Sequence, residues 1–445
     1  MNLIGIFNRR LTSFQIIILG FAAVILLGAL ILMLPISSRS GEMTGFMDSL
    51  FTSTSAVCVT GLVVKDTASY WSFFGQVIIL ILIQIGGIGV ITMASLVSLL
   101  AGKKISLMQR QTIQNALSTP QVGGSVRLIR FVIKVTAMIE TAGAVLLLPV
   151  FVKRFGTVGI WYAVFHSVSA FCNAGFDLMG RHTGRFSSLC AFSGNLYLSI
   201  VICALIVAGG LGFLAWEDIA AYKLKIHKYR MQTKVIIAST AILILVPTIL
   251  FFFIDFSHMH LVRRFSCSLF QAVTPRTAGF NTVDFSRMTD PGRVMIMLLM
   301  LVGGSPGSTA GGMKTTTVAV LTANAFAIFR RRKNAKLFGR RVDDEVVKQA
   351  STVLFMYVTL FLSGALIISV IESQPFEKCA FEAISAIATV GLSLGLTPGL
   401  GVVSHIILML LMFFGRVGGF TVVYAALSYR EGSELKYPLG NITVG

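Results

Sequence analysis

Four short segments of the chain share one pattern, and this repeat limits the possible folds more than any other feature. Each segment is an apolar run of about ten residues with small and hydroxyl side chains on one side, followed by a short polar stretch and a glycine at the same register. The segments are Phe51–Leu62, Phe165–Phe176, Leu269–Phe280 and Phe381–Leu392. An apolar run of this length is too short to cross a bilayer, so it predicts a re-entrant helix.

Composition places the chain in a membrane. Of its 445 residues, 55% are hydrophobic and 12% are charged, which leaves too little polar surface for a soluble globule. Longer apolar runs flank the four short segments and are enough for about eight transmembrane helices. We expect these spans at 12–35, 73–100, 127–150, 195–220, 235–255, 291–329, 347–372 and 400–428.

The order of long helix, short helix, glycine loop and long helix recurs along the whole chain. The predicted fold is therefore an all-α membrane protein with four tandem helix–pore-helix–helix repeats around a pseudo-fourfold pore. We predict repeats at 1–115, 116–230, 231–345 and 346–445, the last with a C-terminal tail. Each repeat contributes an even number of crossings, so all four glycine loops are expected on the same side of the membrane.

The net charge of +19 is explained by topology and does not predict a nucleic-acid partner. With a cytoplasmic N-terminus, the internal segments contain about twice as many Lys and Arg residues as the external ones. We expect a multi-pass protein of the cytoplasmic membrane with both termini in the cytoplasm. The densest basic cluster lies in the linker Arg330–Lys348. It faces anionic lipid or an acidic partner, or it only follows the positive-inside bias.

Four polar loops at membrane depth must line a wet cavity, because carbonyl groups that face lipid cost several kcal/mol each. In such a pore, carbonyl oxygens replace the hydration shell of a cation. The C-terminal end of each short helix adds about half a negative charge. The loops carry no ring of acidic side chains, which favours a monovalent over a divalent cation. The alternative explanation for a repeated glycine is close helix packing.

One long span is interrupted by a stretch that no continuous helix tolerates, with several glycines and a proline. We expect a movable, unwound segment that obstructs the pore beneath the loops. This predicted gate consists of Gly303, Gly304, Ser305, Pro306, Gly307, Ser308, Thr309, Ala310, Gly311 and Gly312. Arg416 lies at comparable depth, and its guanidinium group is predicted to hydrogen-bond carbonyls of this segment and to repel cations. Lys314 is expected to pair with Glu140 or to extend to the cytoplasmic interface.

The loops C-V-T-G-L, C-N-A-G-F, R-T-A-G-F and A-T-V-G-L, together with G-G-S-P-G-S-T-A-G-G-M-K and G-R-V-G-G, resemble the Ktr/Trk/HKT superfamily of potassium transporters. The resemblance covers essentially the whole chain and is strongest to the bacterial KtrB membrane subunits. It implies that the interrupted span is an intramembrane gate and that the four loops form a potassium filter. The filter residues it implies are Val59, Thr60, Gly61, Asn173, Ala174, Gly175, Thr277, Ala278, Gly279, Thr389, Val390 and Gly391.

The same resemblance implies the ions and the partners. K+ is the implied substrate, Na+ is a candidate activator, and no covalently bound cofactor is expected. The implied assembly is a homodimer, embedded in membrane lipid, on which a cytoplasmic KtrA-like nucleotide-binding octameric ring docks. Because the chain shows no soluble domain that could sense a ligand, this ring would supply the control. The linker Arg330–Lys348 is the candidate docking site.

Three alternatives are weighed against potassium uptake. A sodium-permeable or weakly selective monovalent cation transporter would use the same loops. A secondary transporter of another solute usually has two corresponding broken helices in inverted repeats, whereas this sequence has fourfold loops and one span that is visibly broken. An enzyme is not expected, because no nucleophile with a base and no metal cluster is apparent.

Overall fold

The computed structural model describes residues 12–100, 112, 125–419 and 421, and nearly all of their regular structure is helical. Each quarter begins with a long helix, and these are α2 (Ser13–Met33), α8 (Ser125–Phe155), α13 (Met231–Phe253) and α17 (Asp344–Glu372). A short pore helix follows, and these are α3 (Phe46–Val57), α9 (Val158–Phe171), α14 (Leu261–Val273) and α18 (Phe376–Ile387). The predicted all-α class with a fourfold repeat is confirmed, while the exact repeat boundaries stay a prediction.

A second helix closes each quarter after its glycine loop. These inner helices are α5 (Phe73–Ile88), α11 (Leu196–Gly210), α15 (Asp290–Leu301) and α19 (Val402–Val417). The first three begin at a polar N-cap, Ser72, Asn195 or Thr289, whose side-chain oxygen accepts a hydrogen bond from a backbone N–H three residues later. These caps satisfy backbone N–H donors in the first turn of these three inner helices.

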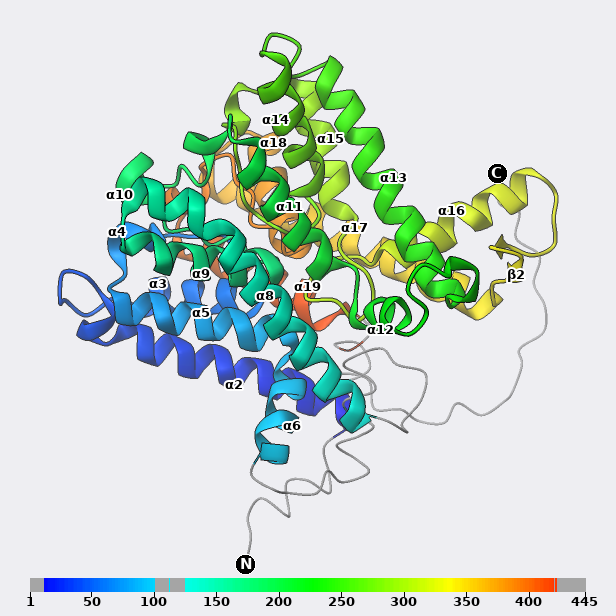
Figure 1. The fold of residues 1–445 in the computed structure, drawn as a ribbon, viewed down its shortest axis with the longest axis horizontal. Helices are drawn as coiled ribbons and strands as arrows, with labels where there is room; N and C mark the ends of the chain where they lie inside the picture. Colours follow the sequence, from blue (N-terminus) through cyan, green and yellow to red (C-terminus); the bar gives the residue numbers. More distant parts are fainter. Residues whose placement is uncertain (1–11, 101–111, 113–124, 420, 422–445) are drawn as a thin grey trace, which may run out of the picture.

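The remaining elements are short. The helices α4 (Thr67–Tyr70) and α10 (Gly180–Thr183) and the 3-10 turns η1 (Pro35–Ser37), η2 (Cys190–Phe192), η3 (Ile226–Lys228), η4 (Phe285–Arg287) and η5 (Thr397–Gly399) connect longer ones. Within the described residues, the strands are β1 (Lys336–Leu337) and β2 (Arg340–Arg341), an antiparallel pair with Lys336 opposite Arg341. This hairpin lies at the tip of α16 (Thr315–Phe329), which projects from the helical bundle (Figure 1).

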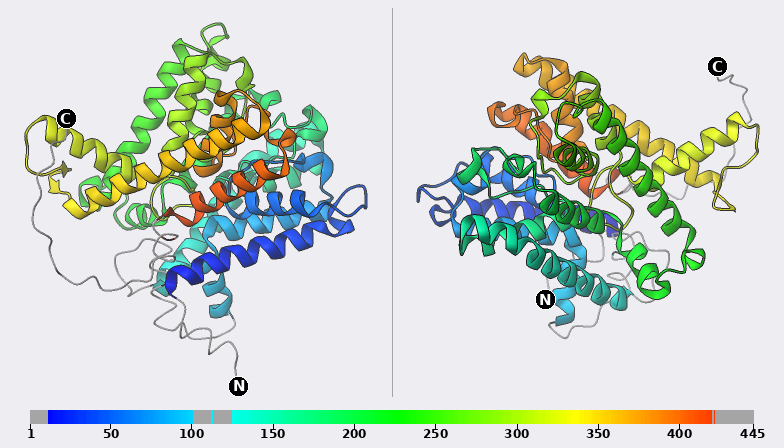
Figure 2. Two further views of the ribbon diagram at one scale, coloured as in Figure 1. Left: turned by 180° about the vertical axis from the view of Figure 1, so that it is seen from behind. Right: turned by 45° about the horizontal axis from the view of Figure 1, so that its top comes forward.

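The four quarters surround a common centre. Each long first helix packs most extensively on the pore helix of its own quarter. The blue to teal helices α2 to α9 lie to one side, and the green to yellow helices α13 to α17 lie opposite (Figure 1). In the view from behind, α17 crosses the face opposite α8 (Figure 2). Fully buried phenylalanines such as Phe51, Phe165, Phe270 and Phe381 lie on the pore helices and form the centre of the core.

Two inner helices are broken in addition to the predicted one, so the expectation of a single broken span is wrong. The chain bends by 98° between α5 and α6 (Val90–Leu100), and by 99° between α11 and α12 (Phe213–Tyr222). The bends occur at Gly89 and Gly212, whose φ values of 96° and 89° are strained for any residue with a side chain. Gly418 ends α19 with a φ of 90°. The case against a secondary transporter therefore rests on the fourfold repeat alone.

A second glycine lies three residues before each of these bends, at Gly86, Gly209 and Gly415. A Cβ atom on any of the three would lie under 3.0 Å from the last carbonyl group of the pore helix in the same quarter, which belongs to Val57, Phe171 or Ile387. The sequences G-G-I-G, G-G-L-G and G-R-V-G therefore combine a close helix contact with a bend. Close packing explains these glycines, as the small-residue pattern of membrane helices predicts.

Four helices, which lie within α2, α8, α13 and α17, are long and apolar enough to cross a membrane. The number rises to six if each bent pair is one span. Two more spans would complete the expected eight. They are the interrupted pair α15 and α16 and the 16-residue helix α19. Of the predicted span 400–428, residues 420 and 422–428 lie outside the described residues.

Candidate functional site: the glycine loops and the interrupted helix

The four loop glycines form a closed ring. A Cβ atom on each of them would lie under 3.0 Å from a carbonyl oxygen of the neighbouring loop. The pairs of glycine and carbonyl residue are Gly61 with Ala174, Gly175 with Ala278, Gly279 with Val390, and Gly391 with Thr60. Because each loop touches the next and the fourth touches the first, the loops meet around one axis. The structure therefore brings the twelve predicted filter residues together.

The backbone of all four loops follows the same path. The glycines have φ values of 93°, 67°, 79° and 88° in chain order. The residue two positions earlier is also left-handed, with φ of 56° at Val59, 59° at Asn173, 64° at Thr277 and 52° at Thr389. Such a conformation costs a non-glycine residue about 1–2 kcal/mol, so it persists only where the surroundings impose it. Its recurrence in four loops indicates a functional constraint on the backbone.

Hydroxyl groups of the pore helices support the loops. Ser55 Oγ accepts a hydrogen bond from the backbone N–H of Gly61 at 3.1 Å, and Ser385 Oγ does the same for Gly391 at 3.0 Å. In the second quarter, Ser169 Oγ donates to the carbonyl of the residue after the ring glycine at 2.8 Å. The sequence shows a hydroxyl-rich side on these helices, but it does not reveal this role.

The third quarter deviates from the other three. Its pore helix α14 ends at Val273, six residues before the ring glycine, whereas the others end four residues before it. Thr274 still has helical dihedral angles, with φ of −62° and ψ of −35°, but Pro275 follows it and has no N–H group to continue the helical hydrogen bonds. The supporting hydroxyl is accordingly that of Thr274, which donates to the carbonyl of Phe280. Arg276, the one cation in the four loops, points away from the ring and donates to Thr240 Oγ1 at 3.3 Å.

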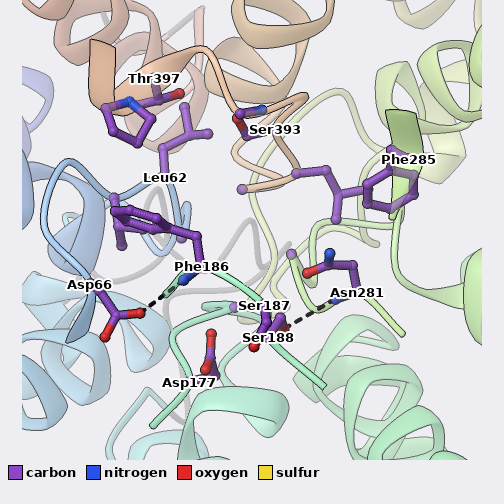
Figure 3. Close-up of a pocket in the computed structure, with 18 of the residues that line it drawn as sticks. Leu62, Asp66, Asp177, Phe186, Ser187, Ser188, Asn281, Phe285, Ser393 and Thr397 are labelled. Atoms are coloured by element: carbon purple, nitrogen blue, oxygen red, sulfur yellow. Dashed lines mark hydrogen bonds between the residues drawn. The ribbon is translucent and has the colours of Figure 1, made fainter. Parts of the chain in front are cut away.

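A cavity of about 440 Å3, called the outer cavity below, is lined by all four ring glycines. Asp66, Asp177 and Asp284 also line it, and Figure 3 shows the first two at its wall. Asp66 Oδ2 accepts a hydrogen bond from the backbone N–H of Phe186 at 3.0 Å. The loops themselves carry no acidic side chain, but this cavity does. Its carboxylates attract cations to the ring.

One of these carboxyl groups is placed to respond to pH. Burial raises the pKa of Asp177 to about 7, a hydrogen bond from the Met179 N–H opposes that rise, and the neighbouring charge of Asp66 adds to it. Near neutral pH, Asp177 is therefore divided between its protonated and charged forms. The negative charge of the outer cavity grows as the pH rises through this range.

The predicted interruption of the third inner helix is confirmed. No helix covers the segment between Leu301 and Thr315, and the segment is held by main-chain hydrogen bonds to the second quarter. Ser305 N donates to Gly210 O at 3.0 Å, and Phe213 N donates to Gly307 O at 2.8 Å. The predicted gate residues therefore lie together and contact the C-terminal end of α11. Whether the segment moves stays a prediction.

Thr309 joins this segment to the loops. Its hydroxyl group donates to the carbonyl of Phe171, the last residue of α9, at 3.0 Å. It also lies 3.4 Å from Asn173 Oδ1, and the Asn173 amide donates to the Arg276 carbonyl at 3.2 Å. This chain of contacts runs from the gate segment to the second and third loops. In the sequence, the only signal of it is a polar Asn where the other loops have Val or Thr.

Arg416 makes the predicted contact. Its Nη1 donates to the carbonyl of Thr309, and its Nη2 donates to the carbonyls of Gly86 and, at 3.2 Å, Gly87. The contacts with α5 were not predicted. One guanidinium group thus connects α19, the gate segment and the inner helix of the first quarter.

The expected pairing of Lys314 with Glu140 is not found, while extension of Lys314 to the cytoplasmic interface stays a prediction. Its Nζ turns back and donates to the carbonyl of Ala310 at 2.9 Å, while Glu140 accepts a hydrogen bond from Gln84 Nε2 at 3.2 Å. Within the described part of the chain, no carboxylate lies within ion-pair distance of Lys314 or Arg416. Both cations instead bind backbone carbonyls. They place positive charge at the gate segment.

A second cavity, of about 420 Å3, is called the inner cavity below. It is lined by Pro306, Gly307 and Gly312 of the gate segment and by Lys314 and Arg416. The inner and outer cavities share no lining residue. The outer cavity is lined by the ring glycines, and the inner cavity is lined by residues of the gate segment.

Known proteins share this sequence and fold. The sequence profile of the TrkH family, described as cation transport protein, matches residues 5–433. The potassium/sodium uptake protein NtpJ of Enterococcus hirae is 41% identical over 98% of each chain. The Ktr system potassium uptake protein B of Bacillus subtilis is 35% identical over 98% of this chain and 97% of its own.

A solved structure agrees with the fold. The crystal structure of the potassium transporter TrkH from Vibrio parahaemolyticus superposes with a TM-score of 0.74 at 20% identity. It covers 92% of this chain and 83% of its own. These names describe cation transport and potassium uptake, and none of them describes an enzyme. The family profile and the two close relatives show that the chain belongs to the TrkH family of cation transport proteins, as its loop motifs predict.

Proposed function

We propose that the chain is the channel-like, ion-translocating subunit of a potassium uptake system. Potassium enters the outer cavity, passes the ring of loops and the gate segment, and reaches the inner cavity. The closed ring of four glycines is the observation that carries this proposal. The two relatives named for potassium and potassium/sodium uptake support the same substrate.

Selectivity is assigned to the loop carbonyls. The ring residues Val59 to Gly61, Asn173 to Gly175, Thr277 to Gly279 and Thr389 to Gly391 offer main-chain oxygens where water is excluded. Each pore helix ends at the ring, so its C-terminal partial negative charge adds to the attraction for a cation. A glycine at each contact lets the neighbouring loop approach without a Cβ atom between them. The ring therefore favours a bare monovalent cation of one size.

Gating is assigned to residues 303–312 with Arg416. The segment blocks the path, and the charges of Arg416 and Lys314 oppose a cation that enters it. For the gate to open, one of two sets of contacts must break. The first is the contact of Arg416 with Thr309, and the second is the set of contacts of Thr309 with the second quarter. Both contacts involve the gate residue that lies against the pore helix α9.

Regulation is assigned to a separate cytoplasmic component. The relative from Bacillus subtilis is named as part of a Ktr system, which points to a partner. We propose a homodimer on which a KtrA-like octameric nucleotide-binding ring docks at Arg330–Lys348, with Na+ as an activator and both chain termini in the cytoplasm. The exposed strand β2 in this linker offers the basic side chains of Arg340 and Arg341 to such a partner.

A sodium-permeable transporter is the second candidate, because one close relative is named for both ions. The Gly175→Ser exchange separates the two. In a strain without its own potassium uptake, the native chain should restore growth at low potassium. Because a Cβ atom at Gly175 would lie 2.8 Å from the Ala278 carbonyl, Gly175→Ser should lower the ratio of potassium to sodium uptake.

The matched control is Gly156→Ser, in the loop before the same pore helix. Gly156 has a φ of 63°, close to the 67° of Gly175, but a Cβ atom there would meet nothing within 4 Å. It carries the same backbone strain without the contact in the ring. A native ion ratio in Gly175→Ser, or an equal loss in Gly156→Ser at equal membrane abundance, would overturn the filter assignment. Sodium uptake by the native chain at the potassium rate would establish the second candidate instead.

A further inference from the structure

An apolar groove of about 510 Å3 lies between α13 and α16, and none of the ring residues lines it. Small residues form much of its floor, including Ala238 and Ser239 of α13 and Ala319 and Ala323 of α16. Phe326 of α16 lines it as well, with its side chain 58% exposed. A narrow channel floored by small residues and flanked by exposed apolar side chains fits a flexible hydrocarbon chain.

The groove is basic at one end. Arg330, Arg332 and Lys336 line it where α16 runs into the β1–β2 hairpin, and all three side chains are exposed. In the described part of the chain, none of the three forms an ion pair, whereas nearby Arg341 pairs with Asp344 at 3.1 Å. Three unpaired cations at the mouth of an apolar groove are complementary to an anionic headgroup, and arginine in particular to a phosphate.

The length of the groove matches one leaflet of a bilayer. Its α16 wall runs from Thr315 to Ala327, about 18 Å along the helix axis. Half of a hydrocarbon core of about 30 Å is close to this length. In the proposed orientation, the basic end lies at the cytoplasmic surface and the other end lies at mid-membrane. There Thr315 N donates to the carbonyl of Gly304 in the gate segment at 3.0 Å.

We infer that this groove binds one anionic phospholipid of the cytoplasmic leaflet, with an acyl chain between α13 and α16 and its phosphate at Arg330, Arg332 and Lys336. The inference rests on the membrane orientation of the proposed function. It adds a defined binding site, separate from the ion path, whose inner end touches the gate segment. A soluble acidic partner would satisfy the three cations but not the apolar channel that leads from them to mid-membrane.

The test is lipid retention by the purified full-length chain, without the regulatory ring. The chain is reconstituted in vesicles of equal parts phosphatidylglycerol and phosphatidylcholine, extracted in detergent, and weighed by native mass spectrometry. One phosphatidylglycerol per chain should remain bound in preference to phosphatidylcholine. The double exchange Arg330→Gln with Lys336→Gln should weaken this retention about 30-fold, from the attraction of two basic residues to an anionic lipid.

Two further variants separate a built site from surface charge. Ala319→Phe fills the groove without altering any charge and should abolish retention. Lys225→Gln with Lys228→Gln removes two exposed charges at η3, which precedes α13 and does not line the groove, and should leave retention unchanged.

Three results would overturn the inference: equal retention of both lipids, full retention by Ala319→Phe, or an equal loss in the η3 control. A shift of Ala319→Phe from dimer to monomer with unaltered lipid content would assign the groove to a second copy of the chain instead. Because the lipid test measures no ion flux, its result does not depend on the filter assignment. In the same way, the ion-uptake test of the filter does not depend on whether a lipid is retained.

Discussion

Exchange of Arg416 for glutamine should open the gate. The exchange removes the charged hydrogen bond from Nη1 to the Thr309 carbonyl, which among the described residues is the one hydrogen bond that joins α19 to the gate segment. A hydrogen bond from a charged donor contributes about 1.5–3 kcal/mol, so its loss shifts the opening equilibrium about 10- to 150-fold. Because glutamine keeps an N–H donor, the increase is expected near the lower limit. Removal of a positive charge from the ion path acts in the same direction.

The assay is potassium influx into vesicles that contain the purified chain, normalised to the amount of inserted protein. Lys314→Gln is the matched control, because it removes an equal charge from the inner cavity. Lys314 binds carbonyls within its own segment, at Ala310 and Gly311, and does not connect it to another helix. Flux should therefore rise clearly less in Lys314→Gln than in Arg416→Gln.

The result that refutes this reasoning is unchanged or reduced flux in Arg416→Gln at native abundance and thermal stability. Equal increases of flux in both variants would support the charge barrier as the cause. They would contradict the proposal that the hydrogen bond between α19 and the gate segment keeps the gate closed. The potassium-to-sodium ratio should stay native in both, because neither side chain contacts the ring residues in the described structure.

Two further outcomes are expected. Thr309→Val removes the hydroxyl bond to the Phe171 carbonyl and should raise flux about 2- to 12-fold, the equivalent of one neutral hydrogen bond of about 0.5–1.5 kcal/mol; lower flux in the same vesicle assay would contradict this. Initial uptake at limiting potassium should increase between about pH 6 and 8, because the raised pKa of Asp177, about 7, means that its charge appears as protons leave in this range. Asp177→Asn should flatten the profile, and a persistent slope in that variant would exclude Asp177 as the titrating group.

The sequence predicts the features that recur or that cost much free energy. The four loops could be aligned because each repeat carries its glycine at the same register. The contact of Arg416 with the gate segment was predictable because an arginine at membrane depth needs acceptors, and residues 303–312 offer free carbonyls. A run with several glycines and a proline also excludes a helix by composition alone.

Other features depend on geometry that a single sequence does not encode. The bends at Gly89 and Gly212 were missed because G-G-I-G and G-G-L-G in an apolar span are also explained by close packing of a straight helix. Only the left-handed φ values reveal them. Asp66 and Asp177 lie in loops whose closure over the ring depends on contacts between quarters, such as that of Asp66 with Phe186.

Lys314 shows a different limit. A long side chain has several acceptors in reach, and a carboxylate elsewhere in the membrane is only one of them. In the folded chain the nearest carbonyls, those of its own segment, are the partners it finds.

The contact between neighbouring loops has a direction. Each ring glycine faces a carbonyl of the loop that follows it in chain order, and the last faces the first. A bulky side chain at one glycine therefore meets the carbonyl of the next loop first, and only at Gly279 would its Cβ atom also approach the previous loop, 3.1 Å from the Cα atom of Gly175. Since the four positions belong to one polypeptide, they can also be changed one at a time, in any combination. The chain thus permits a graded series from one to four substitutions, in which both the number and the order of the altered loops are controlled.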